Sequence, residues 1–420
     1  MSEQQTPQNK ANIVRFPASK KERRKLLRES KDKRVRIVGT LRIACGWLLV
    51  VGAFLFLLTN YQLFSPSSIR SFAEYTVAGL SRREGDITAI NYENATFSDA
   101  ALFEAGLAYA DSDSLFLARP GSVTELTYAL GYSSPVVEAE GGYALVYDRG
   151  GMKAALVSSA GPSAELELSA PILTGSIGRG GRFVLVTDDQ GYRTAVAVYD
   201  TDGTEVFKYQ SSEYYILSAS LSPDGRTLAV LAFLQNGVAL DSHVLFYDVS
   251  SGELDADAAL SDALGIELCY QENSGAAVLC DDGVYFVTRN GKAEHLLTLA
   301  SSDLIAVASR GNAMAIAARS YSGDARADLY TVRSGTLEGP FGLAEETTAL
   351  AVSAAGTAAL SASGVTVCDT GFTPLWRNAE AVGARRILLT DNGTIYALYS
   401  RNARVFTAHS EQSEEISNAK

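Results

Sequence analysis

Few side chains in this sequence are of types able to do redox, acid–base or metal chemistry, and the cysteines are the first candidates. Cys45 lies in an apolar run, and Cys269, Cys280 and Cys368 lie in the second half of the chain. In the segment CYQENSGAAVLC, Cys269 and Cys280 are equally far from a hairpin turn centred just before Gly275. Facing positions on two strands would allow a disulfide in an oxidising compartment. The alternative is that both stay free, because buried free cysteines are common.

The three histidines, His243, His295 and His409, form no H-x-x-x-H or H-x-H cluster, so the sequence supports no zinc site. The acidic turn DTDG at 200–203 lacks the further ligands of a calcium loop and is typical of a tight turn. The glycine-rich stretch 177–182 opens no helix, and we find no nucleophile elbow or Walker loop. The sequence therefore indicates no catalytic, cofactor-binding or metal-binding residue and implies no cofactor.

The elements that would position any site follow one uncharged apolar run, residues 43–58. Extended to Phe64 it has twenty-two residues, and as a helix it would measure about 33 Å, enough to cross the roughly 30 Å hydrocarbon core. Trp47 and Tyr61 would then lie near the two interfaces. A cleaved signal peptide is the rival reading, but forty-two residues precede the run and no good cleavage site follows it. We predict a transmembrane helix over 43–64, with the lipid bilayer as its partner.

Charge gives the expected orientation. Residues 1–42 hold thirteen Lys and Arg and four Asp and Glu, whereas the whole chain carries a net charge of −12. Basic residues beside a first helix stay in the cytoplasm, so we expect a cytoplasmic N-terminus and a cell-membrane protein whose acidic remainder lies outside. The same acidity argues against nucleic acid as a partner.

Composition divides the chain into five parts. We predict a basic cytoplasmic tail at 1–42, disordered at first and helix-tolerant near the membrane, then the transmembrane helix at 43–64 and a linker at 65–84. A β-rich domain follows at 85–408, and a polar tail at 409–420 ends the chain.

The β-rich domain contains a repeat of about forty residues. Two glycine turns recur in each unit, and each follows a short apolar run. The first series is Gly106, Gly142, Gly181, Gly225, Gly275, Gly311, Gly356 and Gly393; the second is Gly121, Gly161, Gly203, Gly252, Gly291, Gly335 and Gly371. Two hairpin turns per unit imply four antiparallel strands, which is the blade of a β-propeller.

The two series differ by one, and this difference predicts how the ring closes. Eight first turns and seven second turns leave the last unit without its fourth strand. The segment 85–93 has no partner of its own, so we expect it to complete the last blade as its outermost strand. The resulting fold is an all-β, eight-bladed β-propeller on a single N-terminal transmembrane helix, with seven blades as the alternative.

Short motifs add a resemblance to known propellers. LSPDGRTLAV at 221–230 resembles the first hairpin of WD-repeat, YVTN and TolB-type blades. CDTGFTPLW at 368–376 is similar to a quinoprotein repeat shortened by one residue, but it occurs in one unit of seven, so quinoprotein function does not carry over. The whole arrangement resembles an uncharacterised family of membrane-anchored propeller proteins of Gram-positive bacteria, a resemblance that implies no activity.

Three function classes remain open. The first is an extracytoplasmic binding or scaffold module with a protein or envelope partner on a propeller rim. The second is an enzyme with catalytic residues around the central channel, and the third is an envelope-structural protein. The first turns are short and no catalytic motif is present, so the sequence favours binding over catalysis. The longest insertions, around 234–241 and 320–325, are where we expect a site, because loops carry function.

Overall fold

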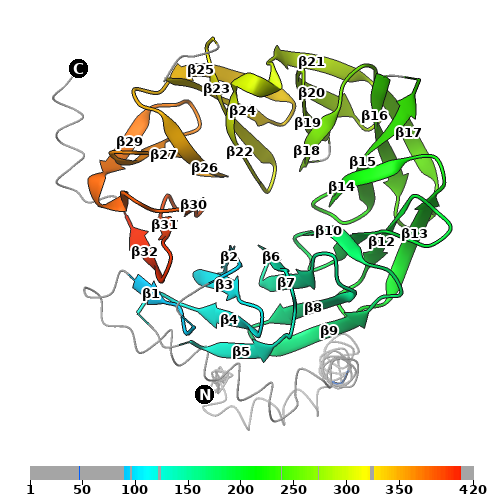
Figure 1. Cartoon of the computed structure of the whole chain (residues 1–420), viewed down its shortest axis with the longest axis horizontal. Coiled ribbons are helices and arrows are strands. Elements are labelled where there is room, and N and C mark those ends of the chain that lie inside the picture. The colour runs from blue at the N-terminus through cyan, green and yellow to red at the C-terminus, as the bar shows by residue number, and fades with distance from the viewer. Residues whose placement is uncertain are drawn as a thin grey trace, which may run out of the picture. The chain divides into compact units, whose positions relative to one another are not determined.

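The computed structural model describes Trp47 and residues 89–94, 97–121, 124–237, 239–272, 274–321 and 326–407. Between Ala89 and Phe406 the chain forms eight four-stranded antiparallel sheets, arranged as blades around a central axis (Figure 1). The prediction of an eight-bladed β-propeller is confirmed, and the seven-bladed alternative is wrong.

Each of the first seven blades uses four consecutive strands, numbered outward from the axis. Blade 1 is β2 (Asp99–Phe103), β3 (Gly106–Ala110), β4 (Ser114–Ala118) and β5 (Leu126–Ala129). Blade 2 is β6 (Pro135–Glu140), β7 (Tyr143–Asp148), β8 (Lys153–Ser158) and β9 (Gly161–Glu167). Blade 3 is β10 (Ile172–Ile177), β11 (Phe183–Thr187), β12 (Thr194–Tyr199) and β13 (Glu205–Ser211). Blade 4 is β14 (Tyr215–Leu221), β15 (Thr227–Asn236), β16 (Ala239–Asp248) and β17 (Leu254–Leu260).

The second half of the ring repeats this plan. Blade 5 is β18 (Gly265–Gln271), β19 (Gly275–Cys280), β20 (Gly283–Thr288) and β21 (Ala293–Thr298). Blade 6 is β22 (Leu304–Arg310), β23 (Ala313–Arg319), β24 (Ala327–Arg333) and β25 (Thr336–Gly342). Blade 7 is β26 (Thr347–Ser353), β27 (Gly356–Ser361), β28 (Gly364–Cys368) and β29 (Pro374–Asn378). Two short 3-10 helices, η2 (Ser301–Asp303) and η3 (Ala379–Ala381), lie in connections between blades.

Blade 8 is built from both ends of the domain. It consists of β30 (Arg386–Leu389), β31 (Ile395–Leu398), β32 (Asn402–Phe406) and, outermost, β1 (Ala89–Asn91). Strand β1 pairs antiparallel with β32, with Ile90 opposite Ala403. The predicted closure of the ring by the first strand is therefore confirmed, and the edge of β32 is paired.

The cores lie between blades rather than inside them. Eight clusters of buried apolar side chains each join one pair of neighbouring blades. A second or third strand is covered on both sides, so β12 (TAVAVY) and β19 (GAAVLC) are buried along their whole length. This explains why the apolar runs lack the alternation of a half-exposed strand.

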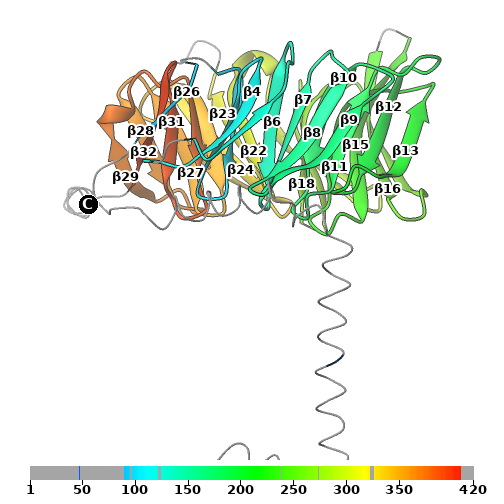
Figure 2. The same cartoon turned by 90° about the horizontal axis from the view of Figure 1, so that it is seen from below.

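Antiparallel strands give the ring two faces, which are seen edge-on in Figure 2. The turns between the first and second strands of all eight blades lie on one face, here termed the turn face. The turns between the third and fourth strands of blades 1 to 7 lie on the same face. The turns between the second and third strands of each blade lie on the other face, together with the connections between blades. This face is here termed the connector face. The insertion predicted at 234–241 is on the connector face, but it continues the β15–β16 pairing as far as Asn236 opposite Ala239 instead of forming a loop.

The predicted tail, anchor, linker and C-terminal tail lie outside the described residues, except for Trp47, which is helical and exposed. Among the described residues, no helix has both the length and the apolarity to cross a bilayer.

Candidate functional site

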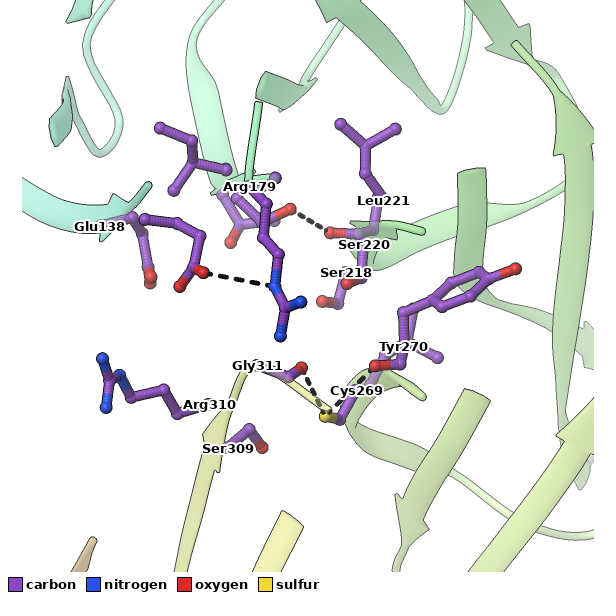
Figure 3. Close-up of a pocket in the computed structure, with 18 of the residues that line it drawn as sticks. Glu138, Arg179, Ser218, Ser220, Leu221, Cys269, Tyr270, Ser309, Arg310 and Gly311 are labelled. Atoms are coloured by element: carbon purple, nitrogen blue, oxygen red, sulfur yellow. Dashed lines mark hydrogen bonds and ion pairs between the residues drawn. The ribbon is translucent and has the colours of Figure 1, made fainter. Parts of the chain in front are cut away.

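A polar cavity of about 370 Å³ lies in the central channel (Figure 3). Its wall comes from the innermost strands of five consecutive blades: β6, β10, β14, β18 and β22. Strands β2, β26 and β30 do not contribute, so the cavity is one-sided. The lining also includes residues of the first turns of blades 3, 4 and 6 on the turn face, and Arg149 at the connector-face end of β7.

Arg179 supplies a positive charge to the turn-face end of the cavity. It lies in the glycine-rich turn between β10 and β11, which is closed by a hydrogen bond from the Gly181 amide to the Gly178 carbonyl (3.0 Å). This confirms the hairpin that the sequence predicts there. The guanidinium points into the cavity (Figure 3), and its Nε lies 3.7 Å from Glu140 Oε1. Its Nη groups donate no hydrogen bond to any residue in the described part of the chain, so they are available to a ligand.

Glu138 lies on β6, two residues before Glu140 and farther from the turn face. It is exposed toward the lumen but enclosed by the channel wall, and this removal from bulk water raises the pKa of Glu138 to about 7. The carboxylates of Asp99 and Glu267 add to the increase in pKa, whereas Arg386 and Arg149 oppose it. Within the described residues Glu138 has no hydrogen-bond or ion-pair partner, because Arg386 Nη1 pairs with Asp99 Oδ1 instead (2.6 Å).

Glu267 supplies a second carboxylate from β18. Burial raises its pKa as well, and the Ser309 hydroxyl acts in the opposite direction. Further hydroxyls come from Ser218 and Ser220 of β14 (Figure 3). The lining thus combines carboxylates, a guanidinium and hydroxyl groups, which suits recognition of a small polar molecule.

The cysteines do not face each other as the sequence suggested, and this expectation is wrong. Cys269 lies opposite Ala277, and Cys280 lies opposite Gly265. The reason is the turn, since Gln271 pairs with Gly275 and moves the centre of the hairpin toward Cys269. Both cysteines and Cys368 are free and buried.

Burial also makes these thiols unreactive. It raises the pKa of Cys269 and of Cys280 to about 12, and that of Cys368 to about 11. Cys269 lines the cavity, but its Sγ is turned toward the Ala313 and Gly311 carbonyls (3.6 and 3.7 Å). A protonated thiol is a poor nucleophile, so Cys269 gives the cavity no covalent chemistry.

The two described histidines lie outside the cavity, on the outer strands. His243 Nδ1 lies 2.6 Å from Asp257 Oδ1, and the His295 ring stacks on Tyr285 with centroids 4.5 Å apart. In the described ranges no group of three or more His, Cys, Asp or Glu is placed to hold a metal ion. His409 lies outside those ranges.

A second candidate surface is the connector face. Eleven large apolar residues of the described propeller are exposed, and eight of them gather on this face. The eight are Met152, Leu173, Tyr192, Tyr215, Leu240, Ile266, Tyr321 and Val382. The other three, Val206, Leu254 and Leu375, lie on outermost strands. Leu240 and Tyr321 fall in the two insertions that the sequence singled out.

Sequence reasoning did not assign Arg179, Glu138 or Glu267 to a site. The available signal was polar residues at alternate positions of a unit's first strand, as in Glu138–Glu140 (EAE) and Ser218–Ser220 (SAS). Alternate residues share one side of a strand, and the innermost strand of a blade borders the channel.

Residues 88–333 match the model of the family of unknown function DUF5711, and the chain belongs to this family. No curated protein matches the sequence. Among solved structures, Sqt1 from Saccharomyces cerevisiae is similar, with 14% identity and a TM-score of 0.53 over 77% of this chain and 99% of that one. BamB from Moraxella catarrhalis is 16% identical, with a TM-score of 0.49 over 77% of this chain and 98% of that one. At 14% identity, the likeness to Sqt1 shows a similar fold and nothing about function.

Proposed function

We propose that this protein is a binding or scaffold module, a β-propeller held outside the membrane by an N-terminal anchor and recognising a protein partner through its connector face. The observation that carries the proposal is the one-sided distribution of exposed apolar side chains, eight of eleven on that face. Apolar residues scattered singly over a surface need no explanation, but a concentration on one face marks an interaction site.

This face includes an aromatic patch on blades 3 and 4, formed by Tyr192, Arg193, Tyr215, Phe233 and Leu240. The Tyr215 and Phe233 rings stack with centroids 5.2 Å apart, and the Arg193 guanidinium lies 4.7 Å from the centre of the Tyr215 ring. Tyrosine and arginine are enriched among the residues that dominate binding energy in protein interfaces. The long β15–β16 hairpin carries part of the patch, and its continuous pairing holds Leu240 in place.

A photoreactive amino acid placed at Tyr192 or Leu240 in the full-length protein is expected to crosslink to one discrete partner in cells. The same residue at Arg226, exposed on the turn face of blade 4, is the matched control and should give no adduct. Adding Tyr215→Ser should weaken the crosslink at Leu240, since truncating such a ring costs roughly 1–2 kcal/mol of binding. An adduct that is equally strong from Arg226, or none from either connector position, would contradict the proposal.

The anchor and its orientation form the second part of the proposal. Support comes from the uncharged run at 43–58 and the +9 charge of the preceding forty-two residues. The bilayer is then a partner of residues 43–64, and the propeller lies on the outer side of the cell membrane.

A membrane-impermeant maleimide added to intact cells should label a cysteine introduced as Ser133→Cys and spare one introduced as Ser19→Cys. Ser133 is exposed on the connector face, and the native Cys269, Cys280 and Cys368 are buried, so the background of the folded propeller should be low. Permeabilised cells provide the control in which both introduced thiols react. Labelling of Ser19→Cys in intact cells, with Ser133→Cys protected, would reverse the orientation.

A further inference from the structure

The cavity in the central channel is lined by charged side chains of both signs. Two of these side chains have polar atoms without a hydrogen-bond partner among the described residues. The Arg179 Nη groups have no hydrogen-bond acceptor among the described residues, and the Glu138 carboxylate has no hydrogen-bond or ion-pair partner there, although the charges of Arg386 and Arg149 act on it. By contrast, another arginine of the cavity lining has an acceptor within the protein. Arg310 Nη1 donates to the Leu389 carbonyl (2.7 Å).

The positions of these groups define a ligand with two ends. Arg179 lies beside Glu140 at the turn-face end of the cavity. Glu138 lies two residues before Glu140 on β6, roughly 7 Å along the strand and farther from the turn face. Because Arg179 lies beside Glu140, one small molecule can reach both Arg179 and Glu138. The cavity volume of about 370 Å³ is within the range of small-molecule sites and is suited to an amino acid or a short peptide.

We infer that this cavity binds a small zwitterion, a molecule with a carboxylate and a protonated amine, as in a free amino acid or a short peptide. Arg179 receives the carboxylate, and Glu138 with Glu267 receives the ammonium group. Ser218 and Ser220 supply hydroxyls along the wall between them. None of the exposed apolar residues of the connector face lines this site, so it does not depend on the proposed partner surface.

The lining disfavours ligands with one kind of charge. A dicarboxylate would place its second anion against Glu138 and Glu267, and Arg149 and Arg386 offset the negative charge at Glu138 only in part. A diamine would place its second cation against Arg179. Enclosed charges need a partner of opposite sign, because the channel wall replaces much of the water around them. A zwitterion satisfies both ends at once and leaves the net charge of the cavity unchanged.

The test is to titrate small ligands into the full-length protein in detergent micelles and to measure the heat of binding by calorimetry. The probes are alanine, glutamate and lysine as free amino acids, the peptides Ala-Ala and Gly-Gly-Gly, and succinate and putrescine as ligands with one kind of charge. Binding of the amino acids identifies free zwitterions as the ligand, and binding of the peptides alone identifies chain termini. No binding in either arm, or binding of succinate or putrescine as tight as that of the zwitterions, would overturn the inference.

Two variants link binding to the named groups. Glu138→Gln and Arg179→Gln should each weaken zwitterion binding roughly tenfold or more, since each removes one charge-assisted contact. Glu294→Gln removes the same charge from the exposed strand β21, outside the cavity, and should leave affinity unchanged. Glu267→Gln gives a second removal of negative charge, should either cavity variant fail to fold. Unchanged affinity in folded Glu138→Gln and Arg179→Gln proteins would refute the site.

Affinity should also depend on pH in a defined direction. The pKa of Glu138 is about 7, with Asp99, Glu267, Arg386, Arg149 and Arg179 as the charged groups around it. The ammonium end binds the ionised carboxylate, so the zwitterion should bind roughly tenfold more tightly at pH 7 than at pH 5.5. Glu138→Gln should remove most of this dependence, and a wild-type affinity that is flat across this range would count against Glu138 as the ammonium ligand.

Discussion

A variant lacking residues 89–92 is expected to lose roughly 5 kcal/mol or more of unfolding free energy, because the ring then has no closing strand. Ile90 and Tyr92 are buried in the cluster between blades 8 and 1, and the Tyr92 ring contacts those of Phe97 and Tyr109. Deletion removes these side chains from the core and leaves the edge of β32 unpaired.

Point substitutions separate the contribution of the core from that of the backbone. Ile90→Ala keeps the β1–β32 pairing and should cost about 2–4 kcal/mol, a typical value for a truncated buried isoleucine. Asn91→Ala is the matched control, since Asn91 is exposed on the same strand, and it should change stability by less than about 0.5 kcal/mol. Chemical denaturation of the three variants measures the effect. A deletion variant as stable as wild type would mean that β1 does not close the ring.

The closing strand was predictable because it follows from counting turns. Every unit has a glycine at its first hairpin, whereas the last unit has none at its third, and only the segment before the first unit can supply the missing strand. Such periodicity is local information, repeated eight times, so single irregularities do not obscure it.

The cavity was not predictable in the same way. Four different blades contribute the lining residues Glu138, Arg179, Glu267 and Ser309. Their spacing along the chain does not predict that they lie close together. Their convergence follows from the radius of the ring and from the side of each innermost strand that borders the channel. Only the closed ring defines both.

Register failed at one hairpin for a related reason. The sequence places the centre of the Cys269–Cys280 hairpin just before Gly275, but pairing begins with Gln271 opposite Gly275. A further irregularity between Gly265 and Glu267 shifts the rest of β18. A one-residue change in turn geometry alters every facing pair, so equal spacing from a glycine does not establish a disulfide.

The repeated glycines themselves lead to the second large effect. Gly356 begins β27 with φ at +146°, and a Cβ added there would lie 2.0 Å from the Cys368 carbonyl oxygen of β28. Gly275 is in the same position in blade 5, where a Cβ would lie 2.1 Å from the Val287 carbonyl oxygen. At these positions the next strand, as well as the turn, requires glycine, because its backbone passes where a side chain would begin.

Gly356→Ala is therefore expected to destabilise the propeller by roughly 3–5 kcal/mol, since a backbone carbonyl cannot move aside without breaking the β27–β28 ladder. Gly180→Ala is the matched control. Gly180 lies in the first hairpin turn of blade 3, has no positive φ, and has nothing within 4 Å of the added Cβ. It should alter unfolding free energy by less than about 1 kcal/mol, within the range for Gly-to-Ala changes at compatible sites. If Gly356→Ala and Gly180→Ala have the same midpoint of denaturation, close approach of strands is not what selects glycine at the start of β27. The requirement would then lie in the turn alone.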